Sequence, residues 1–229
     1  MTRLRVVLWD FDGTLIPFDS EQFLLDTLPL SGVKALGARL FVYADRQGWN
    51  PEMLKKLYGW CLRGVSLEAI DDVCAQIAPH IAAADRTGLR GLAARGLEMQ
   101  VLSCGTAQLS RGTLRAAGLD GCFARVVANP LIVRDGRVAG IERWVIAPQR
   151  KVEIVAKEGV PWEQIAAVGD GLTDLPLLDR AGLPILIASG DEAAEPRPAA
   201  RYAGRGYHIV PSLSEAIAAI EARLATDDR

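Results

Sequence analysis

Acidic side chains follow two short apolar runs of the sequence, at the points where glycine and polar residues begin. The first run is followed by Asp10 and Asp12, and a later one by Asp170 and Asp174 within the motif GDGLTD. Four carboxylates around one crevice would repel one another strongly unless a cation lay between them, and oxygen ligands at this density suit Mg²⁺. The sequence therefore predicts a magnesium site.

Groups that could hold a phosphate occur elsewhere in the chain. The motif SCGT offers the hydroxyl of Ser103 and the start of an expected helix near Gly105, whose free N–H groups and dipole favour an anion. Lys151 offers a positive charge, and Arg150 beside it is a competitor for that role. The predicted site thus combines a metal-binding acid cluster with a cradle for an anion.

The elements that would position these residues alternate between strand and helix. Short apolar runs predict strands at 5–9, 97–103, 165–168, 184–188 and 207–210, and helical patterns cover 87–95, 107–117, 150–157, 173–180 and 212–224. This alternation predicts an α/β fold with a doubly wound parallel sheet, in which ligands bind beyond the carboxyl ends of the strands. The strand-end residues above would then share one edge.

Two segments depart from the alternation. Residues 131–146 (LIVRDGRVAGIERWVI) predict two strands joined around Asp135-Gly136, and we interpret them as an antiparallel flap or edge. Residues from about 17 to 84 show helical stretches and no convincing strand. We therefore expect a catalytic core at 1–16 and 86–229 and an inserted helical cap domain at 17–85. Trp49, Tyr58 and Trp60 are expected to be cap core or cap-to-core contacts, and the alternative is that one of them lines the substrate pocket.

Composition excludes several classes of protein. Lysine and arginine total 26 against 28 acidic residues, without a basic run that could follow a nucleic acid or an anionic membrane. The four cysteines form no CxxC pair, so we expect reduced thiols. No apolar run reaches the length of a signal-peptide core or a membrane span, which predicts a cytoplasmic protein. The oligomeric state stays open.

Taken together, the motifs resemble those of the haloacid dehalogenase superfamily. DFDGTL at 10–15, Ser103 after an apolar strand, Lys151 opening a helix and GDGLTD at 169–174 match its four motifs in order, and SCGT with the Asn129 region resembles the phosphoserine phosphatase branch. The resemblance implies a Rossmann-like core with a helical cap. It also implies a Mg²⁺-dependent phosphatase that acts on a small phosphorylated metabolite.

The resemblance further implies a role for each matching residue. Asp10 would attack phosphorus to form an aspartyl-phosphate, Asp12 would protonate the leaving group and later activate water, and Ser103 and Lys151 would hold the phosphoryl oxygens. Mg²⁺ would be bound by the Asp10 side chain, the Asp12 backbone carbonyl and Asp170. The supporting residues would be Asp174 and Gly171, and the substrate-binding ones Asp19, Gly105 and Thr14.

Asp19 is the sequence's clue to the substrate. It lies nine residues after the expected nucleophile, and an acid at the matching position of phosphoserine phosphatases holds the substrate's ammonium group. The insertion shows no clear match to the arginine-containing cap motif that binds the substrate carboxylate in those enzymes. We therefore expect a small ester with a cationic or hydroxyl-bearing leaving group. The alternative is that Asp19-Ser20 only caps a helix starting near Glu21.

Other functions fit parts of the pattern. A phosphotransferase or phosphomutase would use the same motifs. A dehalogenase is disfavoured because displacement at a carbon–halogen bond needs no acid and would leave Asp12 idle. A noncatalytic phosphate-binding module should have lost a motif residue, and none is lost.

Overall fold

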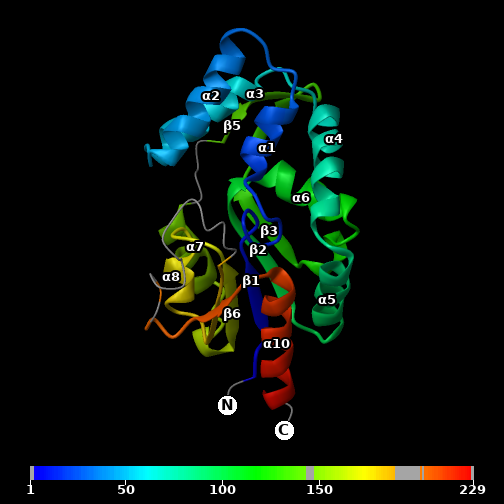
Figure 1. Ribbon diagram of the computed structural model, residues 1–229, viewed down its shortest axis with the longest axis vertical. Coiled ribbons are helices and arrows are strands. Elements are labelled where there is room, and N and C mark those ends of the chain that lie inside the picture. The colour runs from blue at the N-terminus through cyan, green and yellow to red at the C-terminus, as the bar shows by residue number, and fades with distance from the viewer. Residues whose placement is uncertain (1–2, 143–146, 189–201, 203, 228–229) are drawn as a thin grey trace.

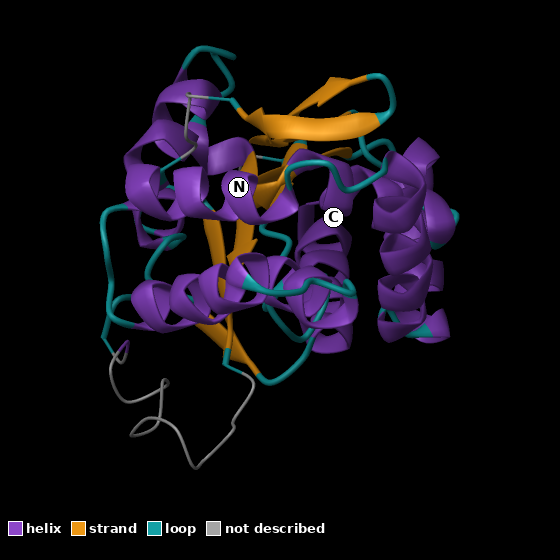
Figure 2. Ribbon diagram, turned by 90° about the horizontal axis from the view of Figure 1, so that it is seen from above, coloured by secondary structure: helices purple, strands orange, loops and turns teal. Residues whose placement is uncertain are grey.

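The computed structural model describes residues 3–142, 147–188, 202 and 204–227. Its main sheet has six parallel strands in the order β3-β2-β1-β6-β7-β8. Their bounds are β1 (Val6–Trp9), β2 (Glu98–Thr106), β3 (Arg125–Asn129), β6 (Ile165–Gly169), β7 (Leu183–Ile187) and β8 (His208–Val210). Helices enclose the strands (Figure 2), which confirms the predicted α/β doubly wound sheet.

The central strand β1 is buried on both of its faces. Val7 and Trp9 belong to an apolar core that also contains leucines of α5 (Ala83–Ala94), α6 (Ala107–Ala116) and α10 (Leu213–Asp227). Val6 and Leu8 belong to a second core with α7 (Pro148–Ala156) and α8 (Leu175–Leu178). Because successive side chains of a strand point to opposite faces, this four-residue apolar run joins two helical layers.

The segment after β1 is helical, as expected. It contains α1 (Ser20–Thr27), α2 (Val33–Arg46), α3 (Pro51–Leu62), α4 (Leu67–Ile77) and the short 3₁₀ helix η1 (Ala78–His80). Helices α2 and α3 lie at the end of the molecule opposite the two termini (Figure 1). Apolar packing continues from α1 and α3 into the core around β1. The division into a core at 1–16 and 86–229 and a cap at 17–85 is kept as a proposal.

The predicted hairpin forms a flap and not an edge of the main sheet. Strands β4 (Leu131–Arg134) and β5 (Arg137–Ile141) make a separate two-stranded antiparallel sheet, turned through Asp135 and Gly136 with positive φ at both. The hairpin reaches the cap, because the Gly64 N–H donates to the Val138 carbonyl at 2.7 Å. Residues 143–146 of the predicted second strand lie outside the described residues.

Two elements differ from the expectation. Strand β3 was missed, since it is an edge strand with three half-buried residues and follows the short 3₁₀ turn η2 (Asp120–Cys122) without a clear apolar run. The helix expected at 173–180 is shorter, because α8 starts only after Asp174. Among the described residues, no helix has both the length and the apolar character needed to cross a membrane.

Candidate active site

The ends of three neighbouring strands bring the predicted residues together. Strand β1 pairs with β2 on one side and with β6 on the other. Asp10 and Asp170 directly follow β1 and β6, and Ser103 lies in the last part of β2, so the three residues share one edge of the sheet. The Asp10 N–H donates to the Val168 carbonyl at 2.9 Å, which continues the β1–β6 ladder to the first site residue.

Lys151 of α7 reaches this edge of the sheet with its side chain. Its side chain is fully buried, and Nζ donates at 2.7 Å to Asp10 Oδ1 and at 2.7 Å to Asp174 Oδ1. Burial alone would lower the pKa of Lys151, but the charges of Asp10 and Asp174 outweigh it and raise the pKa above its ordinary value. Arg150, the competitor, instead pairs with Glu153 at 2.9 Å in an exposed position. Lys151 therefore provides a fixed positive charge beside Asp10.

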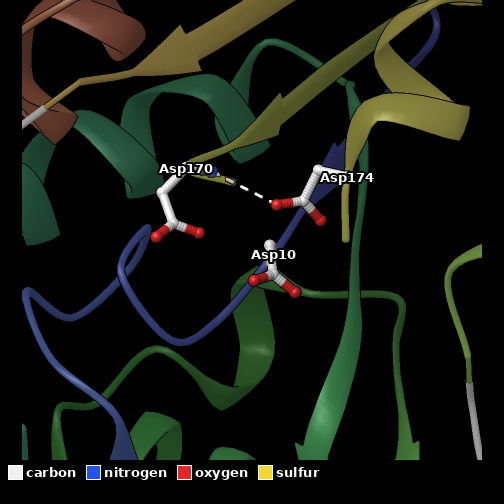
Figure 3. Close-up of side chains that lie close together, drawn as sticks. All are labelled: Asp10, Asp170 and Asp174. Atoms are coloured by element: carbon white, nitrogen blue, oxygen red, sulfur yellow. Dashed lines mark hydrogen bonds between the residues drawn. The ribbon is translucent and has the colours of Figure 1, made fainter. Parts of the chain in front are cut away.

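Three carboxylates, those of Asp10, Asp170 and Asp174, converge at this edge of the sheet (Figure 3). Oxygens of Asp10, Asp170 and Asp174 all lie within 4.8 Å of one another. Asp174 Oδ2 accepts from the Asp170 N–H at 3.2 Å and the Gly171 N–H at 3.4 Å, so Asp174 also fixes the loop that carries Asp170. The carboxylate of Asp12 is not part of this cluster, in keeping with an expected contribution through its backbone carbonyl.

The electrostatics of this cluster fit a divalent cation. Burial, and then the charge of Asp174, raises the pKa of Asp10 to about 7. Burial, and then the charges of Asp10 and Asp174, raises the pKa of Asp170 to about 8. Ionised carboxylates in this position need a positive partner, and Lys151 contacts only one oxygen of Asp10 and one of Asp174. The remaining oxygens form the hard-ligand set that Mg²⁺ prefers.

A glycine allows the β1 loop to approach Asp170. Gly13 has φ +71, and a Cβ atom on it would lie 2.0 Å from Asp170 Oδ2. In the same turn, the N–H groups of Thr14, Leu15 and Ile16 all donate to the Phe11 carbonyl. Thr14 is buried and does not line the catalytic cavity. A role of Thr14 in substrate binding therefore stays a prediction.

Asp12 is held close to the start of the cap. Its Oδ1 accepts from the Ser20 N–H at 2.8 Å, and Oδ2 lies 2.7 Å from where a Cβ of Gly105 would be. Burial, followed by the charge of Asp19, raises the pKa of Asp12 well above its ordinary value. The raised pKa favours the protonated form of Asp12, which a general acid requires.

The end of β2 carries the anion-binding motif. Ser103 is buried, and its Oγ accepts from the Gly105 N–H at 2.8 Å. Asn129 Nδ2 donates to the Cys104 carbonyl at 2.7 Å and so ties β3 to this turn. Burial raises the pKa of the Cys104 thiol to about 11, which keeps it protonated and unsuited to nucleophilic attack.

These side chains open into one cavity of about 640 Å³ that extends from the strand ends into the cap. Its lining includes Asp10, Asp12, Ser103, Gly105 and Asp170 on the core side, and Phe18, Asp19, Glu21, Phe41, Asp45, Trp49, Leu54 and Lys55 on the cap side. Asp19 lines the cavity and is also the N-cap of α1, where Oδ1 accepts from the Gln22 N–H at 2.8 Å. Both interpretations of Asp19 are therefore compatible with its position.

Sequence reasoning missed a buried ion pair on the cap side. Lys55 Nζ donates to both carboxylate oxygens of Glu21, at 2.6 and 2.7 Å, and the Thr106 hydroxyl donates to Glu21 Oε1 at 2.6 Å. The network joins α1, α3 and the end of β2. Its members lie 34 and 85 positions apart, and no local motif links them.

Comparison with known proteins gives consistent matches. Residues 7–179 match the family model of haloacid dehalogenase-like hydrolases. The phosphoserine phosphatase of Methanocaldococcus jannaschii is 28% identical over 188 residues, which cover 80% of this chain and 85% of that protein. The phosphoserine phosphatase of Streptomyces coelicolor is 30% identical over 214 residues, 91% of this chain but only 48% of that longer protein.

Solved structures agree with these matches. A phosphoserine phosphatase structure with a phospho-aspartyl intermediate analogue has a TM-score of 0.61 and 26% identity, and the match covers 81% of this chain and 87% of that one.

Proposed function

The chain belongs to the haloacid dehalogenase-like hydrolase family and is a phosphatase similar to phosphoserine phosphatases, and from this premise we propose that it hydrolyses a small-metabolite phosphomonoester through an aspartyl-phosphate on Asp10. The observation that carries the proposal is the buried contact of Lys151 with Asp10 at 2.7 Å, next to Asp170 and Asp174. This contact favours the ionised carboxylate, which is the nucleophilic form.

Each step of the proposed reaction uses a group of this chain. An Asp10 oxygen forms a bond to phosphorus while the bond from phosphorus to the ester oxygen breaks. Asp12 gives its proton to the departing alkoxide, then accepts a proton from the water that attacks the aspartyl-phosphate and restores Asp10. Ser103, the loop at Gly105 and Lys151 hold the phosphoryl oxygens, and Lys151 offsets their charge.

Mg²⁺ is the proposed cofactor. The side chains of Asp10 and Asp170 and the backbone carbonyl of Asp12 would hold it, with Asp174 and Gly171 supporting the loop. When bound, it supplies Lewis-acid stabilisation of charge on the phosphoryl oxygens. A cytoplasmic location and a small-molecule partner remain predictions of the sequence.

The assignment of hydrolysis is tested with p-nitrophenyl phosphate. We expect Mg²⁺-dependent release of one phosphate per p-nitrophenol, with and without added alcohols. A phosphotransferase would instead release p-nitrophenol in excess of phosphate and form a phosphorylated alcohol. A noncatalytic phosphate-binding module would release neither product.

The charge of the cavity indicates the kind of leaving group. On the cap side, Lys55 is already neutralised by Glu21 through two short contacts. Asp19 and Asp45 line the same space, and the charge of Asp19 adds to burial in raising the pKa of Asp45. Among the described residues that line the cap side, the uncompensated charge is therefore negative. Trp49 and Phe41 supply aromatic faces, which attract cations. We propose a cationic leaving group that has no carboxylate.

Substitution of Asp45 tests the proposed charge selection and leaves Asp19, the N-cap of α1, in place. Asp45→Asn is expected to lower kcat/KM about 10-fold for phosphoethanolamine, on the scale of a lost charged contact, because the cation loses an attractive charge. The neutral analogue 2-hydroxyethyl phosphate should be hydrolysed with kcat/KM changed by less than about 3-fold. The two esters differ only in the terminal group.

The control is Asp72→Asn, which removes the same charge from an exposed position on cap helix α4 that does not line the cavity. It should leave both esters unaffected. Equal losses on both esters in Asp45→Asn, or a wild-type enzyme that prefers phosphoserine over phosphoethanolamine, would contradict the proposed charge selection while leaving phosphatase activity intact.

A further inference from the structure

Helix α2 exposes a stripe of large apolar side chains. Val33 is 71% exposed, Leu36 68%, Leu40 43% and Tyr43 58%. They follow one another at intervals of three, four and three residues, so they lie along one side of the helix. Surface helices ordinarily direct charged and polar residues outward. The helix buries a different side, on which Ala38, Phe41 and Ala44 lie.

Helix α3 extends the stripe into a wider surface. The two helices pack together, and the Trp60 ring lies so close to Gly37 that a Cβ atom there would be 2.6 Å from it. Trp60 is 43% exposed and Met53 57% exposed. The opposite side of the same helix pair contributes Phe41 and Leu54 to the catalytic cavity. We name the exposed set Val33, Leu36, Leu40, Tyr43, Met53 and Trp60 the outer cap face.

The outer cap face is large enough for a specific interface. From the exposed fractions, its six residues together expose roughly 700 Å², above the ~300–600 Å² of the largest apolar patch on a typical monomer. A standard interface buries ~800 Å² per partner. The helix pair also lies at the end of the molecule opposite the N- and C-termini of the chain (Figure 1).

The spacing of the stripe indicates what the partner is. Apolar residues at intervals of three and four form the seam between helices that pack side by side. Such a stripe can pack against a second copy of itself when the two helices lie antiparallel about a two-fold axis. In that arrangement, Leu36 of one copy meets Leu40 of the other, and Val33 meets Tyr43. We infer that the outer cap face is the interface of a homodimer formed by two copies of this chain.

Sedimentation velocity of the full chain at 1–100 μM tests the inference. We expect the wild-type mass to rise to twice the 24.7 kDa of one chain. Leu36→Glu/Leu40→Glu should be monomeric over the same range, at least a 100-fold weaker association, because it places charges face to face in an apolar seam. Both positions are exposed, so the variant should still fold, with the Tm of the monomer, and should still hydrolyse p-nitrophenyl phosphate. Ala222→Glu, an exposed position on α10, is the matched control and should remain dimeric.

A cross-link tests the geometry of the interface. Leu36→Cys/Leu40→Cys should oxidise to a covalent dimer whose disulfide joins position 36 of one copy to position 40 of its partner. A wild-type protein that is monomeric at 100 μM would overturn the inference, and so would a dimer that survives the double glutamate substitution. An anionic lipid surface is the other occupant to consider, since Arg39 and Lys56 flank the face. If the protein is a monomer that binds phosphatidylserine vesicles through the outer cap face, the dimer is wrong and the face is a lipid-binding surface.

Discussion

Asp10→Asn is expected to lower kcat on any phosphomonoester substrate by more than about 100-fold, which corresponds to a barrier about 2.7 kcal/mol higher. The amide preserves the shape of the side chain but is a far poorer nucleophile than a carboxylate. The fold should persist because Lys151 keeps its contact with Asp174 at 2.7 Å and the substitution adds no atoms to the core. Initial rates at saturating substrate, with circular dichroism as the check on folding, measure the effect.

Asp72→Asn is again the control, since it makes the same chemical change at an exposed position outside the cavity. It should retain wild-type turnover. An Asp10→Asn protein that is folded and retains more than about a hundredth of the wild-type rate would rule out attack by Asp10.

Removal of divalent cations is the second large effect. A chelator should reduce phosphatase activity to background, added Mg²⁺ should restore it, and Ca²⁺ should restore it poorly. Ca²⁺ takes more ligands at longer distances, which would disturb the alignment of Asp10 with phosphorus. Full activity in chelator would contradict the proposed cofactor.

Thermal unfolding gives a readout of the metal that does not depend on activity. In chelator, the pKa of Asp10 is about 7 and that of Asp170 about 8, both above the ordinary value of 3.8. Between these values and 3.8 the folded state holds more protons than the unfolded state, so their contribution to the free energy of unfolding falls as pH rises. Mg²⁺ binds the ionised carboxylates and should raise Tm more at pH 8 than at pH 6. An equal increase in Tm at both pH values would mean that the metal binds away from Asp10 and Asp170.

Local sequence signals predicted the parts of the fold that depend on local chemistry. The apolar run before Asp10, the Asp135-Gly136 turn and the helical patterns after β1 were sufficient to predict the central strand, the hairpin and the insertion. Strand β3 was not predicted, because an edge strand is half buried and needs no continuous apolar run. The packing of the hairpin against the cap was also not predicted, because its hydrogen bonds to Gly64 and Val65 join segments far apart in the sequence.

The same distinction holds for the candidate site. Asp10, Ser103, Lys151 and Asp170 are strand-end or helix-start residues within motifs, so their convergence follows from the parallel sheet. The motif did not reveal that Thr14 is buried, because its burial accompanies the backbone turn at Phe11. The Glu21–Lys55–Thr106 network and Asp45 were missed because their proximity arises only from the packing of the cap helices.

The most direct measurement of the proposed mechanism is chemical identification of the phosphorylated residue. The enzyme is mixed with excess substrate and Mg²⁺, quenched in acid at successive times, reduced with borohydride and digested for mass spectrometry. An aspartyl-phosphate is reduced to homoserine, so the account predicts homoserine at position 10 in the wild type and none in Asp10→Asn. Phosphate release with position 10 unmodified at every quench time, or homoserine at another aspartate, would contradict it.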